Sequence, residues 1–364
     1  MKFIVEREPL LAALQASIGV VERRQTMPIL ANVLVAVRDG KVSLTATDLE
    51  VELVAQATIT SGTAGAVTLP GRKLLDICRS LPEKASLTVA LEGERATIRA
   101  GKSRFTLTTL PAGEFPVIDE INEQQALDIP QADLKRLLDK THFSMAQQDV
   151  RYYLNGMLLE SDGKMLRTVA TDGHRLALCE MDLAAGGKGQ QIIIPRKGVL
   201  ELQRLLSGEG SVKLTIGTNH IRAQIGDIRF TSKLIDGRFP EYSRVIPAKP
   251  PRVVLADRDA LRASLQRAAI LSNEKYRGIR LTLRSNVLTI QAHNPEQEEA
   301  VEELEVTYAG EDLEVGFNVN YLLDALAAVD GSEVEIGLTD GNSSCLVHAP
   351  GSASARYVVM PMRL

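Results

Sequence analysis

An aspartate and a histidine lie two residues apart in the stretch TVATDGHRLAL, residues 168–178. A carboxylate that orients an imidazole is half of a hydrolytic triad, so Asp172 and His174 are candidate catalytic residues. The two residues also lie between short apolar runs, where Asp and Gly commonly build a turn. The elements around this stretch must distinguish a hydrolase from a structural turn.

The rest of the chain offers little support for an enzyme. No GxSxG, Walker or HExxH pattern is present. The other histidines lack the spacing of metal ligands: His142, His220, His293 and His348. The three cysteines are far apart and form no CxxC pair, which favours a reducing cytoplasm: Cys78, Cys179 and Cys345. We therefore expect no catalytic residue, no metal and no cofactor.

The elements that position this stretch occur three times. Each copy begins with a strand that runs into an amphipathic helix, at 3–21, 127–145 and 253–271. The expected apolar stripes of these helices are Leu11, Leu14 and Ile18; Leu134, Leu137 and Leu138; and Leu261, Leu265 and Ala268. Pro9 suits a first helical turn, and Asp257 suits a helix cap.

A strand pair with a polar turn follows in each copy, at 32–47, 155–171 and 278–292. Each pair ends at an equivalent turn, which makes Asp48, Asp172 and Asn294 counterparts. No histidine follows two residues after Asp48 or Asn294. This difference favours a turn that was later recruited to binding over a catalytic pair.

A second helix and further strands complete each copy, giving a β-α-β-β-β-α unit of about 120 residues. Such a chain is an α+β protein of three repeats, with two helices packed on antiparallel sheets in each repeat. Proline and charge near 118–126 and the segment VIPAKPPR (245–252) mark the boundaries. The predicted subdomains are 1–121, 122–244 and 245–364.

Charge is segregated along the chain although the net charge is only −4. Residues 249–284 hold nine basic and three acidic side chains, whereas residues 285–364 hold two and fourteen. Basic helix residues, among them Arg72, Lys73, Arg196 and Lys197, could attract phosphates without reading base sequence. No apolar run approaches the roughly 18 residues of a membrane span, and the charged N-terminus does not resemble a signal peptide.

Several motifs identify a family resemblance that covers the whole chain. They are DVRYYLNG (149–156), ATDGHRLA (170–177), DGRFPEY (236–242), AILSNEKYRG (269–278), NPEQEEA (294–300) and YVVMPMRL (357–364). With the threefold repeat, they resemble the β subunit of bacterial DNA polymerase III, the replicative sliding clamp.

The resemblance implies a DNA-clamp fold and a head-to-tail homodimer that forms a ring of six subdomains around duplex DNA. The ring would confer processivity and catalyse no reaction itself. Its implied partners are double-stranded DNA, the polymerase III catalytic subunit, the clamp loader, and other polymerases and repair proteins that carry short linear motifs. A cytoplasmic location follows, and no membrane is implied.

The resemblance also implies residues for each contact. For DNA, the loop residues are Arg24, Gln148, Tyr152 and Tyr153, although without the resemblance the tyrosine pair would be expected to serve packing. The implied peptide pocket consists of Leu154, Thr171, Gly173, His174, Arg175, Leu176, Pro240, Arg244, Val245, Asn318, Tyr321, Val358, Met360, Pro361, Met362, Arg363 and Leu364. Asn342 departs from the apolar residue that the family more often has at the pocket rim.

The acidic run 294–305 would face the first subdomain of a partner protomer. The expected interface joins Glu298 and Glu302, with the apolar Ile270 and Leu271, to Lys102, Arg104, Phe105 and Leu107. A head-to-tail contact that closes into a ring needs such complementary, non-identical surfaces. The alternatives are a protein-interaction hub that never binds DNA and a hydrolase that uses Asp172 and His174.

Overall fold

The computed structural model describes residues 1–21, 27–118, 120–183 and 189–363. It divides into two compact units, one of residues 1–135 and 197–234, the other of residues 136–196 and 235–364. Each unit contains strands from two of the predicted subdomains. The three predicted subdomains therefore remain a description of the sequence repeat.

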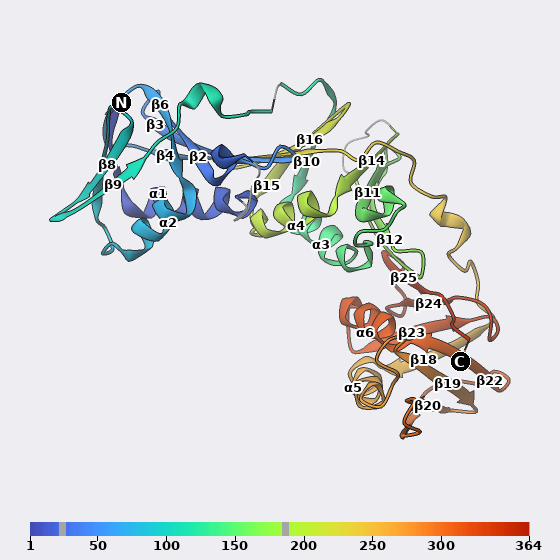
Figure 1. Ribbon diagram of the computed structural model, residues 1–364. Helices are drawn as coiled ribbons and strands as arrows, with labels where there is room; N and C mark the ends of the chain where they lie inside the picture. The colour runs from blue at the N-terminus through green and yellow to red at the C-terminus, as the bar shows by residue number, and fades with distance from the viewer. Residues whose placement is uncertain (22–26, 119, 184–188, 364) are drawn as a thin grey trace. The chain divides into compact units, whose positions relative to one another are not determined.

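The first unit holds two antiparallel sheets (Figure 1). The smaller has the order β5(Ser61–Thr63), β1(Lys2–Glu6), β7(Ser86–Glu92), β8(Arg95–Ala100) and β9(Ser103–Thr108). The larger has the order β10(Glu123–Pro130), β15(Ser211–Gly217), β16(His220–Ile225), β17(Ile228–Lys233), β4(Val51–Thr58), β3(Lys41–Thr47), β2(Asn32–Arg38) and β6(Gly65–Pro70). The larger sheet thus combines strands of the first and second repeats.

The second unit is built in the same way. Its larger sheet has the order β14(Gln190–Pro195), β11(Gly156–Ser161), β12(Met165–Thr171), β13(Arg175–Asp182), β25(Ala355–Val359), β24(Cys345–His348), β23(Glu333–Leu338) and β18(Arg252–Asp257). Its smaller sheet has the order β21(Glu299–Glu305), β20(Val287–His293), β19(Gly278–Arg284) and β22(Leu313–Asn318). The larger sheet here combines the second and third repeats.

Two α-helices occur in each repeat, as the sequence predicts. They are α1(Arg7–Ser17) and α2(Gly71–Ser80), α3(Gln131–Asp139) and α4(Arg196–Leu205), and α5(Arg258–Ala269) and α6(Val319–Ala328). The Asp257 side chain caps α5 by accepting a hydrogen bond from the Ala260 N–H at 2.7 Å, which confirms the predicted cap. An additional strand, β6, β14 or β22, leads into each second helix, and the first repeat also has the short β5, whereas the β-α-β-β-β-α pattern predicts three strands between the helices.

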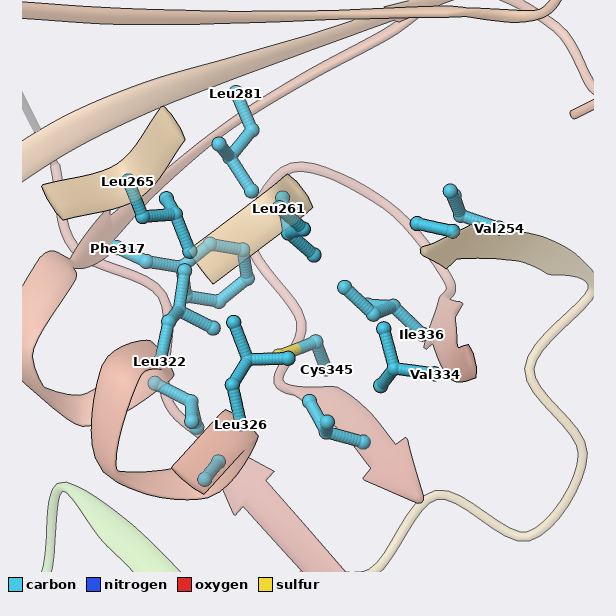
Figure 2. Packing of buried hydrophobic residues seen from close by; sticks show 14 of the residues in the cluster. Val254, Leu261, Leu265, Leu281, Phe317, Leu322, Leu326, Val334, Ile336 and Cys345 are labelled. Atoms are coloured by element: carbon cyan, nitrogen blue, oxygen red, sulfur yellow. The ribbon is translucent and has the colours of Figure 1, made fainter. Parts of the chain in front are cut away.

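Apolar stripes on the helices form the cores. Figure 2 shows Leu261 and Leu265 of α5 beside Leu322 and Leu326 of α6, and all four side chains are buried. The stripe predicted for α1 is partly wrong: the helix buries Leu10, Ala13, Leu14, Ala16 and Ser17, whereas Leu11 and Ile18 are only partly covered. A 3₁₀ turn begins at Ile18, so the α-helical spacing does not extend to that residue.

The hairpin turns follow the predicted chemistry. Arg38 pairs with Lys41 across the two-residue turn Asp39-Gly40, and both turn residues have positive φ values of 51° and 73°. No helix among the described residues is long and apolar enough to cross a membrane.

Candidate functional site

The TDGHR turn, residues 171–175, connects β12 to β13. The Asp172 Oδ1 atom accepts hydrogen bonds from the backbone N–H groups of His174 and Arg175, at 2.9 and 3.0 Å. Its Oδ2 atom accepts one from the Arg175 Nε at 3.1 Å. Gly173 has a φ of +88°, which an L side chain adopts only with strain. The carboxylate therefore holds the turn and its arginine.

The same turn occurs in the other repeats without the histidine. Asp48 Oδ1 accepts from the backbone N–H groups of Glu50 and Val51, at 3.0 and 2.7 Å. Asn294 Oδ1 accepts from the Glu298 N–H at 2.9 Å across a turn one residue longer. Asp48 and Asp172 share one hydrogen-bonding pattern, and Asn294 also accepts from a backbone N–H across its longer turn. These contacts favour a structural turn over a hydrolytic half-triad.

Arg175 joins this turn to α6. Its guanidinium lies over the Tyr321 ring at 4.6 Å from the centroid and pairs with Asp324. It also donates to the Phe143 carbonyl at 2.8 Å. The His174 ring stacks beside Tyr321, with ring centroids 6.5 Å apart. Burial, followed by the charge of Asp172, raises the pKa of Tyr321.

A mostly apolar cavity of about 170 Å³ opens on the other side of the turn. We call it the apolar pocket, and its lining residues are Arg151, Leu154, Thr171, Gly173, Arg175, Leu176, Pro240, Glu241, Tyr242, Val245, Val358 and Met360. Nine of these were predicted from the sequence. Arg151, Glu241 and Tyr242 were missed, although Glu241 and Tyr242 lie between the predicted Pro240 and Arg244.

A short acid–base pair supports the pocket from its rim. Arg151 donates to both carboxylate oxygens of Asp149, from Nε at 3.0 Å and from an Nη atom at 2.8 Å. These hydrogen bonds and that of the Arg151 N–H lower the pKa of Asp149 to about 2. The Arg151 guanidinium also reaches the Asp172 carbonyl at 3.3 Å. A side chain at position 173 would contact that guanidinium, which gives Gly173 a second reason to be glycine.

The C-terminal residues cross the surface next to the pocket. The Met360 N–H donates to the His174 carbonyl at 2.9 Å, and the Met362 N–H donates to the Gly316 carbonyl at 2.8 Å. Met360 lines the apolar pocket. Met362 and Arg363 line a second cavity of about 360 Å³ that also includes Asn342. The main chain therefore fixes the tail as a partition between two cavities.

Of the other eight predicted pocket residues, Met362 and Arg363 line the second cavity, and Pro361 is partly exposed on the tail between Met360 and Met362. His174 and Tyr321 line a neighbouring polar cavity of about 470 Å³. Asn318 caps α6 by accepting from the Asn320 N–H at 2.9 Å. Arg244 is exposed and pairs with Glu241 at 2.5 Å. Leu364 lies outside the described residues.

The predicted DNA-contacting residues are only partly available. Arg24 lies outside the described residues. Lys197 pairs with Asp48 at 2.5 Å, and Arg72 donates to the Val21 carbonyl at 2.6 Å, while Lys73 is exposed. Arg196 donates weakly to the Met145 carbonyl at 3.4 Å, and burial followed by the charge of Arg175 lowers its pKa.

The two loop tyrosines, predicted to contact DNA or to serve packing, differ in exposure. Tyr152 is 58% exposed and lies edge-to-face against Tyr153, with ring centroids 5.8 Å apart. Tyr153 packs against the buried cluster that includes Leu176 and Val358. Tyr152 and Gln148, which has a positive φ of 55°, are thus exposed, whereas Tyr153 is partly buried.

The predicted interface residues lie on two edge strands, in the turns that precede these strands, and after the end of one helix. Lys102 and Arg104 are exposed, Phe105 is partly covered, and Leu107 is buried within its own unit. Ile270 is 75% exposed just after α5, and Leu271 is partly covered. Glu298 is exposed, whereas Glu302 pairs with Arg267 at 2.6 Å. In the part of the chain that the structure describes, no group of three or more His, Cys, Asp or Glu side chains is placed to hold a metal.

Three tandem repeats whose sheets continue from one repeat to the next define a clamp-type fold. Family models for the N-terminal, central and C-terminal domains of the DNA polymerase III beta subunit match residues 1–119, 128–241 and 243–363. The chain therefore belongs to the DNA polymerase III beta subunit family, the beta sliding clamps, and functions as a processivity clamp.

Close relatives support this assignment over the full length of both chains. The beta sliding clamps of Salmonella typhimurium and Escherichia coli K12 are 55% and 54% identical. The crystal structure of the Pseudomonas aeruginosa beta subunit is 52% identical, with a TM-score of 0.98 over all of both chains. The Caulobacter crescentus subunit is 39% identical, with a TM-score of 0.95 and the same coverage.

Proposed function

We propose that two copies of this chain close head to tail into a ring that encircles duplex DNA, and that the apolar pocket tethers polymerases to the ring. The observation that carries the ring is the repeated junction between strands. Strand β4 of the first repeat pairs with β17 of the second, and β13 of the second repeat pairs with β25 of the third. The counterparts that remain are β21 of the third repeat and β9 of the first.

Both counterparts lie at a sheet edge, where unpaired backbone groups can accept another strand. In the two internal junctions Phe230 pairs with Leu53, and Tyr357 pairs with Ala177. The same register between protomers places Phe105 opposite Ala300 and Arg104 opposite Val301. An interprotomer pair of β9 and β21 would thus continue the pattern of the whole chain.

Charge and apolar exposure on these edges support the pairing. Glu299 and Glu303 flank Val301 on the exposed face of β21, where they would lie diagonally across from Arg104. Val301 is 53% exposed and Ile270 is 75% exposed, so the protomer alone leaves apolar surface uncovered beside the acidic strand. Acidic and apolar groups on one end meet basic and apolar groups on the other.

The ring would hold DNA by encirclement and through weak contacts with phosphates. Lys73, Gln148, Tyr152 and Arg24 are the proposed DNA contacts, with Arg72, Tyr153, Arg196 and Lys197 in supporting positions. Contacts to phosphates carry no base sequence, so the ring can slide. The clamp would catalyse no reaction and need no cofactor, and its three buried free cysteines suit the cytoplasm.

The apolar pocket would receive short linear segments of the polymerase III catalytic subunit, the clamp loader, other polymerases and repair proteins. The clamps of Pseudomonas aeruginosa and Bartonella birtlesii have been crystallised bound to griselimycin. We propose that this chain binds griselimycin in the apolar pocket, which makes the compound a probe for it. Tethering raises the local concentration of polymerase at the primer end, so that it rebinds before it diffuses away.

Loading the protein onto nicked circular DNA, followed by linearisation, tests the ring. Encirclement predicts retention on circles and loss from free linear ends, measured by gel filtration of the DNA-bound fraction. Equal retention on both forms would indicate ordinary DNA binding. No retention on either form, with griselimycin still bound, would favour a protein-interaction hub.

A further inference from the structure

One wall of the apolar pocket is made by a segment with little regular structure. Pro240, Glu241, Tyr242 and Val245 line the pocket from the connection between β17 and β18. Apart from the three-residue 3₁₀ turn η6(Tyr242–Arg244), residues 234–251 form no helix or strand. The position of this wall therefore depends on side-chain contacts.

Apolar packing supplies part of the attachment. Phe239 is buried in a cluster with Leu158 and Val358, and the rings of Tyr153 and Tyr242 pack against that cluster. The ion pairs of Glu241, with Arg238 at 3.7 Å and with Arg244 at 2.5 Å, are exposed and stay within the segment. Such pairs contribute little to fixing the segment against the sheet.

Tyr242 adds a directional contact to the sheet. Its hydroxyl donates a hydrogen bond to the Glu160 carboxylate on β11. Glu160 lies directly opposite Gln191 on β14 and Arg167 on β12 in the strand register. The carboxylate also accepts from the Gln191 amide at 2.6 Å and lies 3.8 Å from the Arg167 guanidinium.

The acceptor is itself held in place by the sheet. Arg167 pairs with Asp162 at 2.9 Å and with Glu180 at 2.8 Å, and Glu180 in turn pairs with Arg356 on β25. Removing the tyrosine hydroxyl would leave Glu160 with Gln191 and Arg167. The loss would therefore fall on the 240–245 wall, while the sheet keeps its partners. Burial, followed by the hydrogen bond to Glu160, raises the pKa of Tyr242 and keeps the donor protonated.

We propose that Tyr242 is a positioning residue for the apolar pocket, whose hydroxyl anchors the 240–245 wall to Glu160 in the arrangement that receives a ligand. This inference rests on the proposed binding function of the pocket. Without the anchor, the wall samples open arrangements, and only the closed fraction of molecules binds. The apparent affinity then falls in proportion to that fraction, and the loss is measured as a slower association rate.

The test is griselimycin binding to the immobilised protein by surface plasmon resonance. Tyr242→Phe keeps the ring and removes the hydroxyl, so we expect Kd to rise about 5-fold through a slower association rate. Glu160→Gln keeps an acceptor oxygen and should bind within about 2-fold of the unsubstituted chain. Tyr308→Phe is the matched control, because buried Tyr308 donates to the Glu311 carbonyl at 2.5 Å outside the pocket.

Hydrogen exchange at the wall gives a second readout. The amides of Arg244 and Val245 donate within the turn at 3.3 and 3.1 Å, and both should exchange faster in Tyr242→Phe than in Tyr308→Phe. Unchanged association and exchange rates in Tyr242→Phe would overturn the inference and leave the pocket assignment intact. An unsubstituted chain that does not bind griselimycin would overturn both proposals.

Discussion

Two internal junctions of this chain have the same strand register and different chemistry. At the junction of β4 with β17, Glu52 lies opposite Thr231; at the junction of β13 with β25, Leu176 lies opposite Val358. Glu52 is 2% exposed, accepts a hydrogen bond from the Ile118 N–H at 2.9 Å, and lies 3.8 Å from Arg229. Leu176 is 3% exposed and lines the apolar pocket.

The turns at the two junctions also differ in side-chain size at one equivalent position. Leu49 adopts a φ of +77° where the second repeat has Gly173 at +88°, so a side chain occupies the space next to the first turn. Just after β25, Met360 lines the apolar pocket and its N–H donates to the His174 carbonyl at 2.9 Å. One backbone pattern thus carries a buried carboxylate at the first junction and the apolar pocket at the second.

The largest expected effect concerns the third junction, which the chain can complete only with a second copy. Ile270→Asp with Leu271→Asp places two charges in the proposed interface and should convert the dimer into a folded monomer. Sedimentation velocity measures the mass, and circular dichroism checks the fold. Val253→Asp, at an exposed valine on β18, is the control and should remain dimeric. A doubly substituted chain with unchanged mass would refute the interface.

A cross-link sharpens the same comparison. Arg104→Cys combined with Val301→Cys places thiols at directly opposed positions if the interprotomer register copies the internal junctions. Oxidation should then give a covalent dimer on a non-reducing gel. Shifting one cysteine to Glu302 moves it to the other face of the strand and should abolish the product. Efficient cross-linking of the shifted pair alone would contradict the register.

Removing the C-terminal residues tests their contribution to the apolar pocket at the junction of β13 with β25. Deletion of residues 360–364 removes Met360 from the pocket and Met362 from the Gly316 carbonyl, so griselimycin affinity should fall at least 100-fold. The dimer should persist because the tail lies outside the proposed interface. Isothermal titration calorimetry gives the affinity. Retained affinity in the truncated chain would reject the tail as a wall of the pocket.

Glu52→Leu gives the junction of β4 with β17 the residue type that Leu176 has at the junction of β13 with β25. The Ile118 N–H would lose its acceptor, and Arg229 would lose a nearby carboxylate, so the free energy of unfolding should fall by about 1–3 kcal/mol. Urea denaturation measures the change. Glu50→Leu, on the same turn but exposed, should change stability by less than about 0.5 kcal/mol. Equal stability of the two variants would show that the buried carboxylate contributes nothing.

The smallest effect concerns the acid–base pair at the rim of the pocket. Because the pKa of Asp149 is lowered to about 2, its contribution to stability is fully present above the unfolded pKa near 3.9 and is lost as pH falls towards 2. Its carboxyl chemical shift should stay constant from pH 7 to pH 4. In Arg151→Ala the same signal should begin to move near pH 5. Identical titrations would contradict the pairing.

Most of the repeat architecture follows from the sequence because apolar periodicity and turn residues are local signals. The Asp257 cap, the Asp39-Gly40 hairpin and two helices per repeat all depend on residues within a few positions of each other. The extra strand before each second helix was missed. Its short apolar run merges with the helix that follows, so it carries no periodicity of its own.

The residues of the apolar pocket could not be predicted from local sequence patterns alone. The family resemblance supplied Leu154, Leu176 and Val358, but not Tyr242, whose role requires the Glu160 carboxylate more than eighty positions earlier. The pattern also did not predict that Lys197 pairs with Asp48 from another repeat. No spacing rule connects such positions.

The sequence by itself determined the threefold repeat, the two helices of each copy and the counterpart turns at Asp48, Asp172 and Asn294. The tertiary structure decided that strands pair across repeat boundaries, that Asp172 holds a turn and Arg175, and that the C-terminal residues partition two cavities. The reason is physical: helix and turn preferences arise from near neighbours, whereas strand partners and buried acceptors are chosen by segments that meet only once the chain has folded.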